Sequence, residues 1–208
     1  MPEIGLFPLG LVLLPGERVP LHIFEERYKE LINECLDTES EFGIVLLNSR
    51  GTRDVGTRAE VVEVLERYDD GQLDIVVQGT DRFTLLDVRS ERSFLTADVS
   101  PVEDDTPLPP DSEYEACLAE YRRVMVATGV EFDEPSPDHR GLAFALASRF
   151  HMGIDVKQEL LEMRSESDRL NRVKELLEAS AAAIRKQAVE KRASTNGKVD
   201  RIGPLGPH

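Results

Sequence analysis

The four histidines are the first residues to test for chemistry, because imidazole serves both as a general base and as a metal ligand. His22 has a carboxylate three residues later, at Glu25, the most catalytic-looking pair in the chain. His22 also stands between two aliphatic residues where an extended segment passes into a helix, and there a ring nitrogen can bond a backbone group. We therefore interpret His22 as structural. His139, His151 and His208 have no partner at metal-ligand spacing.

Other catalytic and phosphate-binding patterns are missing from the sequence. A P-loop requires G-x-x-x-x-G-K-[ST], whereas Gly197-Lys198 precedes a valine, and no G-x-S-x-G occurs. Cys35 and Cys117 each lie on the apolar stripe of an expected helix, which favours buried, reduced thiols over a disulfide or a zinc site. The sequence thus predicts no catalytic residue, no cofactor and no metal.

Charge and hydropathy disfavour further classes of partner. The chain has 40 acidic and 25 basic residues, a net charge of −15, and such a chain repels the phosphates of nucleic acids and anionic lipids. The apolar run at residues 4–16 is broken by proline and glycine and is shorter than the ~20 residues of a spanning helix. A signal peptide would have a basic segment before this run, where the chain has Glu3. We expect a cytoplasmic protein that binds neither nucleic acid nor membranes.

Secondary-structure signals begin with extended segments. Residues 6–14 indicate a strand and a turn, Pro15-Gly16 a second turn and Val19–Ile23 a short extended piece. From Glu25 onward, apolar residues recur at helical spacing as far as Leu36. Asp69–Gly71 is a hairpin turn signal. Further strands are expected at Phe42–Leu47, Arg58–Tyr68, Gln72–Gly79, Gly79–Val88 and Ser93–Val102.

After these strands the pattern becomes helical. The acidic, proline-containing segment Glu103–Ser112 is the best domain boundary. We predict a β domain at 1–103, a linker at 104–111, a helical subdomain at 112–192 and a disordered tail at 193–208. Helix starts are expected at Ser112 with Glu115 as a capping box, near Pro137 for a helix over Asp138–Phe150, at Asp155 with Gln158, and at Ser165 or Ser167.

Several different short motifs follow one another between residues 4 and 180. The most specific are Phe7-Pro8-Leu9, Pro15-Gly16 and Leu21-His22-Ile23-Phe24-Glu25 followed by Arg27-Tyr28. Together they resemble the N-terminal substrate-binding domain of the Lon protease family. Glu26 stands where family members often carry proline, in a first helical turn that tolerates either residue. The motif positions, which we expect to be mainly structural, are Phe7, Pro8, Pro15, Gly16, His22, Glu25, Arg27, Gly43, Gly79, Arg82 and Phe83.

The resemblance implies an α+β fold. Its N-terminal part would be a PUA-like β pseudo-barrel with one helix, filled by Phe7, Leu9 and residues 12–14, and its C-terminal part an α-helical bundle. Lon proteases continue into an ATPase module and a Ser–Lys peptidase domain. Neither is recognisable here, so the chain resembles the stand-alone bacterial relatives.

The expected function is that of a non-enzymatic module that binds unfolded or exposed polypeptide segments. A protease or chaperone is a further expected partner, and the protein would be a monomer or weak dimer. The site would be an apolar patch beside the first helix or the cleft between the two parts, with candidate contacts at Pro20, Leu21, Phe24, Tyr28 and Phe132. The alternatives are a PUA-like RNA-associated module, which the charge disfavours, and a small-ligand-binding or cryptic hydrolytic domain. An exposed apolar patch would favour peptide binding. A basic groove would favour RNA binding, and an enclosed polar pocket would favour a small ligand.

Overall fold

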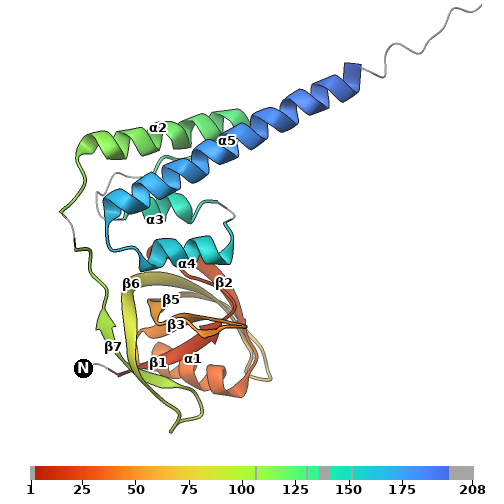
Figure 1. The fold of residues 1–208 in the computed structure, drawn as a ribbon. Coiled ribbons are helices and arrows are strands. Elements are labelled where there is room, and N and C mark those ends of the chain that lie inside the picture. Colours follow the sequence, from red (N-terminus) through yellow and green to blue (C-terminus); the bar gives the residue numbers. More distant parts are fainter. Residues whose placement is uncertain (1–2, 106, 130, 136–140, 151, 197–208) are drawn as a thin grey trace, which may run out of the picture.

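The computed structural model describes residues 3–105, 107–129, 131–135, 141–150 and 152–196. Figure 1 shows a curved, barrel-like sheet with one helix at its lower end and a layer of helices above it. The strands are β1 Glu3–Leu9, β2 Arg18–Ile23, β3 Phe42–Asn48, β4 Gly51–Thr52, β5 Val55–Arg67, β6 Leu73–Arg89 and β7 Thr96–Pro101. The helices are α1 Glu26–Thr38, α2 Asp111–Thr128, α3 Leu142–Ala147, α4 Ile154–Glu162 and α5 Glu166–Asn196.

The strands form a closed ring of pairings, and the fold class is α+β. Their order is β1-β7-β6-β5-β3, and β3 pairs in parallel with β1, which closes the ring. Helix α1 packs its apolar face, which includes Leu31 and Ile32, into a core shared with Phe7, Phe42 and Ile75. Periodicity alone therefore located both α1 and the face that it buries.

Strand β6 differs from the sequence-based expectation. Gly79 was expected to separate two strands, but the structure has one strand of 17 residues from Leu73 to Arg89. Gly79 is buried within it, and a Cβ there would lie 2.4 Å from the carbonyl oxygen of Leu14. The glycine therefore permits a close backbone approach rather than a turn.

The segment after β1 was expected to fill the barrel, and only part of it does. Leu13 lies in the barrel core. Its neighbours Val12 and Leu14 belong to the other large core cluster, which consists mainly of residues from the helices. This segment is therefore shared between the two parts of the molecule, because neighbouring side chains of an extended chain face opposite sides.

The helical part packs on the barrel through α4, while α2 and α5 run side by side (Figure 1). Two expected caps are wrong: α2 starts at Asp111 after Pro110, and α4 at Ile154 after Gly153, each without a side-chain cap. The third expectation is confirmed, because the Ser165 Oγ accepts a 3.2 Å hydrogen bond from the Asp168 N–H at the start of α5.

Other helix limits also differ from expectation. The helix expected over Asp138–Phe150 is shorter, at Leu142–Ala147, and its expected start at Pro137 lies outside the described residues. Helix α5 continues to Asn196, into the segment expected to be disordered. Among the described residues, no helix combines the length and apolarity needed to cross a membrane.

Candidate functional site

The first half of β6 lies between β2 and β5 and has one buried and one outward-facing side. Leu73, Ile75 and Val77 are buried in the barrel, so the alternate residues Asp74 and Val76 face outward. We call the surface formed by the outward side chains of these three strands the outer sheet face. It consists of Arg18, Pro20, His22, Phe24, Glu60, Val62, Glu63, Leu65, Glu66, Tyr68, Asp74, Val76 and Gln78.

Two irregularities in β5 enlarge the apolar part of this face. The pairing of β5 with β6 shifts by one residue after Val61 and again after Val64. Each bulge sets two residues of β5 opposite a single residue of β6. As a result Val62 and Leu65, which are 37% and 54% exposed, lie beside the carboxylates that follow them in the sequence.

One end of the face carries an aromatic cluster around Asp74. The His22 Nδ1 lies 2.6 Å from one Asp74 carboxylate oxygen, and the Tyr68 hydroxyl donates a 2.7 Å hydrogen bond to the other. The ring of Phe24 stacks on His22 with centroids 5.9 Å apart, and Phe24 is 59% exposed. His22 was expected to bond a backbone group. It bonds a side chain at the surface instead, because β6 places Asp74 directly opposite it.

The cluster has a defined protonation pattern. The hydrogen bond that each donates to Asp74 raises the pKa of His22 and raises that of Tyr68 to about 12. In return, hydrogen bonds from His22 and Tyr68 lower the pKa of Asp74. At neutral pH Asp74 is therefore ionised, and Tyr68 keeps its proton as a hydrogen-bond donor.

The five candidate contacts do not share one surface. Pro20 is exposed on β2 and Phe24 directly follows this strand, so both lie on the outer sheet face. Leu21 is half-buried against the barrel core. The Tyr28 ring is buried with its centroid 4.0 Å from that of a core phenylalanine. Phe132 belongs to the helical part, where it packs edge-to-face on a buried tyrosine.

Several motif residues lie in the barrel core. Phe7 and Phe83 are buried. Neighbouring side chains lie so close to Gly43 that a Cβ at this position would be 2.8 Å from the Phe83 ring. Gly16 has a φ of +77°, a backbone conformation that favours glycine in the turn before β2. These positions hold the sheet that presents β2 and β6.

Two further motif residues lie at the start of α1. Arg27 donates a 2.9 Å hydrogen bond to Glu25, and its guanidinium lies 4.5 Å from the centroid of the Tyr28 ring. Glu25 itself precedes the helix without making a side-chain cap. This ion pair covers one side of the Tyr28 ring and is exposed to solvent.

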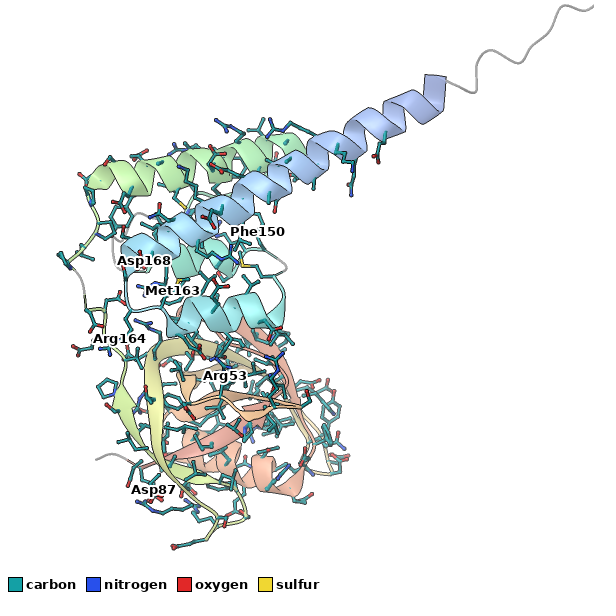
Figure 2. The ribbon with its side chains drawn as sticks, in the orientation of Figure 1. Arg53, Asp87, Phe150, Met163, Arg164 and Asp168 are labelled. Carbon is teal, nitrogen blue, oxygen red and sulfur yellow. The ribbon has the colours of Figure 1, made fainter. Side chains whose placement is uncertain are left out.

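Arg82 belongs to a buried ionic network that joins the barrel, the following segment and the helices. Its guanidinium donates to Asp104 at 2.8 Å and to the carbonyl of Met163 at 2.5 Å. Arg169, on α5, donates to the same carboxylate at 2.7 Å, to the same carbonyl at 2.8 Å and to Glu166 at 2.7 Å. Met163 lies between α4 and α5 above the barrel (Figure 2). The network therefore fixes the helices on the sheet.

The cleft between the two parts is bridged by polar contacts. Arg53 lies on the barrel side of the cleft (Figure 2) and donates hydrogen bonds of 2.6 and 2.8 Å to the two carboxylate oxygens of Glu162 on α4. Nearby, the Gln158 amide donates to the Val55 carbonyl at 3.1 Å. The pocket beside them, of about 580 Å³, is lined largely by charged and amide side chains. The polar contacts hold the two sides of the cleft together, whereas the outer sheet face carries exposed apolar side chains on three adjacent strands, so we take that face as the candidate site. Within the described ranges, no three His, Cys, Asp or Glu side chains are placed to hold a metal ion.

The fold and the candidate site define a barrel with attached helices and an exposed sheet face that carries both apolar and acidic side chains. The family model for the ATP-dependent protease La (LON) substrate-binding domain matches residues 3–179, and the chain belongs to this family. A Lon protease of Parabacteroides distasonis is 29% identical over 144 residues, 65% of this chain and 17% of the relative. Lon protease 1 of Hydrogenovibrio crunogenus is 25% identical over 195 residues, 85% of this chain and 24% of the relative. The chain thus spans a quarter or less of these relatives.

Solved structures show the same fold. The crystal structure of a Lon N-terminal domain protein from Xanthomonas campestris has a TM-score of 0.64 and 25% identity, covering 83% of this chain and 97% of that chain. The N-terminal domain of the Mycobacterium avium complex Lon protease has a TM-score of 0.65 and 19% identity, with 87% and 98% covered. The similarity therefore extends over both the sheet and the helices.

Proposed function

We propose that the chain is a non-enzymatic module that binds polypeptide segments through its outer sheet face. The observation that carries the proposal is the exposure of Phe24, Val62, Leu65 and Tyr68 on one side of three adjacent strands. Exposed apolar groups gathered on one face are typical of interaction sites. The description of the matched family as a substrate-binding domain supports a polymer ligand.

Apolar contacts on this face can supply a moderate affinity. Burying an aliphatic side chain contributes about 1.5–3 kcal/mol. Ordering a flexible segment opposes this gain, so three or four anchors should give roughly micromolar binding, about −8 kcal/mol. An affinity in this range suits transient capture of many different segments.

The RNA alternative has less support. The outer sheet face carries the carboxylates of Glu60, Glu63, Glu66 and Asp74, and these repel a phosphate backbone. The finer assignments stay predictions: the PUA-like label, the helical bundle, the boundaries around 104–111, the cytoplasmic location and a protease or chaperone partner.

The proposal is tested by binding of a permanently reduced, unfolded protein, measured by fluorescence anisotropy. Phe24→Ala and Leu65→Gln should each weaken binding at least about fivefold, because each removes an exposed apolar anchor. The control is Val126→Gln on α2, an aliphatic side chain on the helical part that is 73% exposed, more than Phe24 or Leu65. Equal effects of all three variants, or displacement of the ligand by RNA, would refute the proposed surface.

The non-enzymatic part of the proposal has its own assay. Purified protein should hydrolyse neither ATP nor the unfolded ligand, because the sequence contains no phosphate-binding loop and no recognisable nucleophile–base pair. Turnover that copurifies with the chain and disappears on substitution of a single serine, lysine or histidine would contradict it.

A further inference from the structure

The outer sheet face carries a regular arrangement of charge as well as apolar groups. In the segment Glu60-Val-Val-Glu-Val-Leu-Glu66, acidic residues recur every third position. A regular strand would direct alternate residues of such a pattern into the barrel. The two bulges prevent this, because each adds one residue to β5, and Glu60, Glu63 and Glu66 are all exposed.

These three carboxylates have no cationic partner of their own. Some exposed acids elsewhere in the molecule pair with arginine, as Glu34 does with Arg92. Glu60, Glu63 and Glu66 form no ion pair with any residue in the described part of the chain. Arg18, on the same face, donates instead to the Gln78 side chain at 2.7 Å. The negative charge of the three glutamates is therefore available to a ligand, and it lies directly beside the apolar side chains.

The geometry of β2 indicates how a ligand would lie. The Gly79 N–H donates to the Glu17 carbonyl at 3.0 Å, so the backbone groups of Glu17 point toward β6. Backbone groups of successive residues in a strand point to opposite edges. Those of Arg18, Pro20 and His22 therefore point away from β6, toward the other edge of β2. Pro20 has no N–H to offer there, which hinders addition of a further strand. A ligand would therefore lie across the face and be held by side chains.

We propose, resting on the proposed function, that this face selects segments in which lysine or arginine residues are interspersed with aliphatic or aromatic residues. The apolar ligand side chains cover Val62, Leu65 and Phe24, while the cations approach Glu63 and Glu66. Complementary charge adds specificity to apolar contact, which by itself is not selective. The net charge of −15 further attracts basic segments over longer distances.

Three labelled peptides of equal length and equal apolar content provide the test, with Lys, Gln or Glu at every third position. The lysine peptide should bind best and the glutamate peptide least. The double variant E63Q/E66Q should weaken the lysine peptide by about three- to tenfold, the effect of two exposed ion pairs, and leave the glutamine peptide unchanged.

The matched control is E91Q/E178Q, which removes two exposed carboxylates outside the face and changes the net charge equally. It should alter the binding of the lysine peptide less than twofold. Equal weakening by both double variants, or equal binding of the three peptides, would overturn the selection of basic segments while leaving polypeptide binding intact. Failure of all three peptides to bind, together with no effect of Leu65→Gln on unfolded protein, would instead refute the proposed function.

Discussion

Removing the Arg169 side chain should show how strongly the buried network holds the molecule together. This residue is 2% exposed and donates hydrogen bonds to Glu166, Asp104 and the carbonyl of Met163. Arg169→Met keeps the apolar volume under the guanidinium but leaves Glu166, whose side chain is only 3% exposed, without its cation. Removing one partner of a buried ion pair costs roughly 3–5 kcal/mol.

Thermal unfolding followed by circular dichroism measures this loss. A chain of this size loses roughly 2–4 °C per kcal/mol, so the midpoint should fall by about 6–20 °C. The control is Arg172→Met, one turn along α5, whose exposed pairs with Glu159 and Glu175 should contribute at most about 1 kcal/mol. If the two variants unfold at the same temperature, the network does not stabilise the fold as argued.

Acid titration checks the same network independently. Burial would raise the pKa of Asp104, but hydrogen bonds and charge from Arg169, followed by those from Arg82, outweigh it and hold the pKa below its usual value. A carboxylate with a lowered folded-state pKa stabilises the protein above its unfolded value, and this is lost as pH falls through the folded pKa. Stability of the native sequence should therefore decline below about pH 4. Arg169→Met should reduce this decline, and an unchanged decline would contradict the assignment.

Three further outcomes follow from single positions. Gly79→Ala should prevent normal folding or lower the unfolding midpoint sharply, because its Cβ would meet a backbone carbonyl at 2.4 Å, whereas Gly10→Ala has open space and should be tolerated. Ser165→Ala should destabilise the protein by about 1 kcal/mol in urea unfolding, through loss of the α5 cap. An NMR titration should place the pKa of His22 above that of a histidine in an unfolded peptide, and Asp74→Asn should lower it. The stabilisation from His22 is present at low pH and is lost as pH rises through its folded pKa.

Local sequence patterns were sufficient to predict several helices and strands, and the ordered motifs were sufficient to predict the family. Apolar spacing located α1 and its buried face, turn residues marked the hairpin before β6, and Ser165 marked the start of α5. These features depend on neighbouring residues, so local propensity and periodicity are sufficient to predict them. Two of the candidate contacts that followed from the family resemblance, Pro20 and Phe24, lie on the outer sheet face.

The other members of the site could be recognised only from contacts between segments that are distant in the chain. Asp74 meets His22 across a strand pair, the bulges turn Val62 and Leu65 outward, and Arg82 shares Asp104 with a residue of α5. The recurrence of glutamate at every third position of β5 was visible in the sequence. It predicts an outward face only once the pairing register of β5 with β6 is known. Register, bulges and shared ion partners arise from contacts between segments distant in the chain. The free energies of these contacts arise only when the segments pack together, so no single segment of the sequence predicts them.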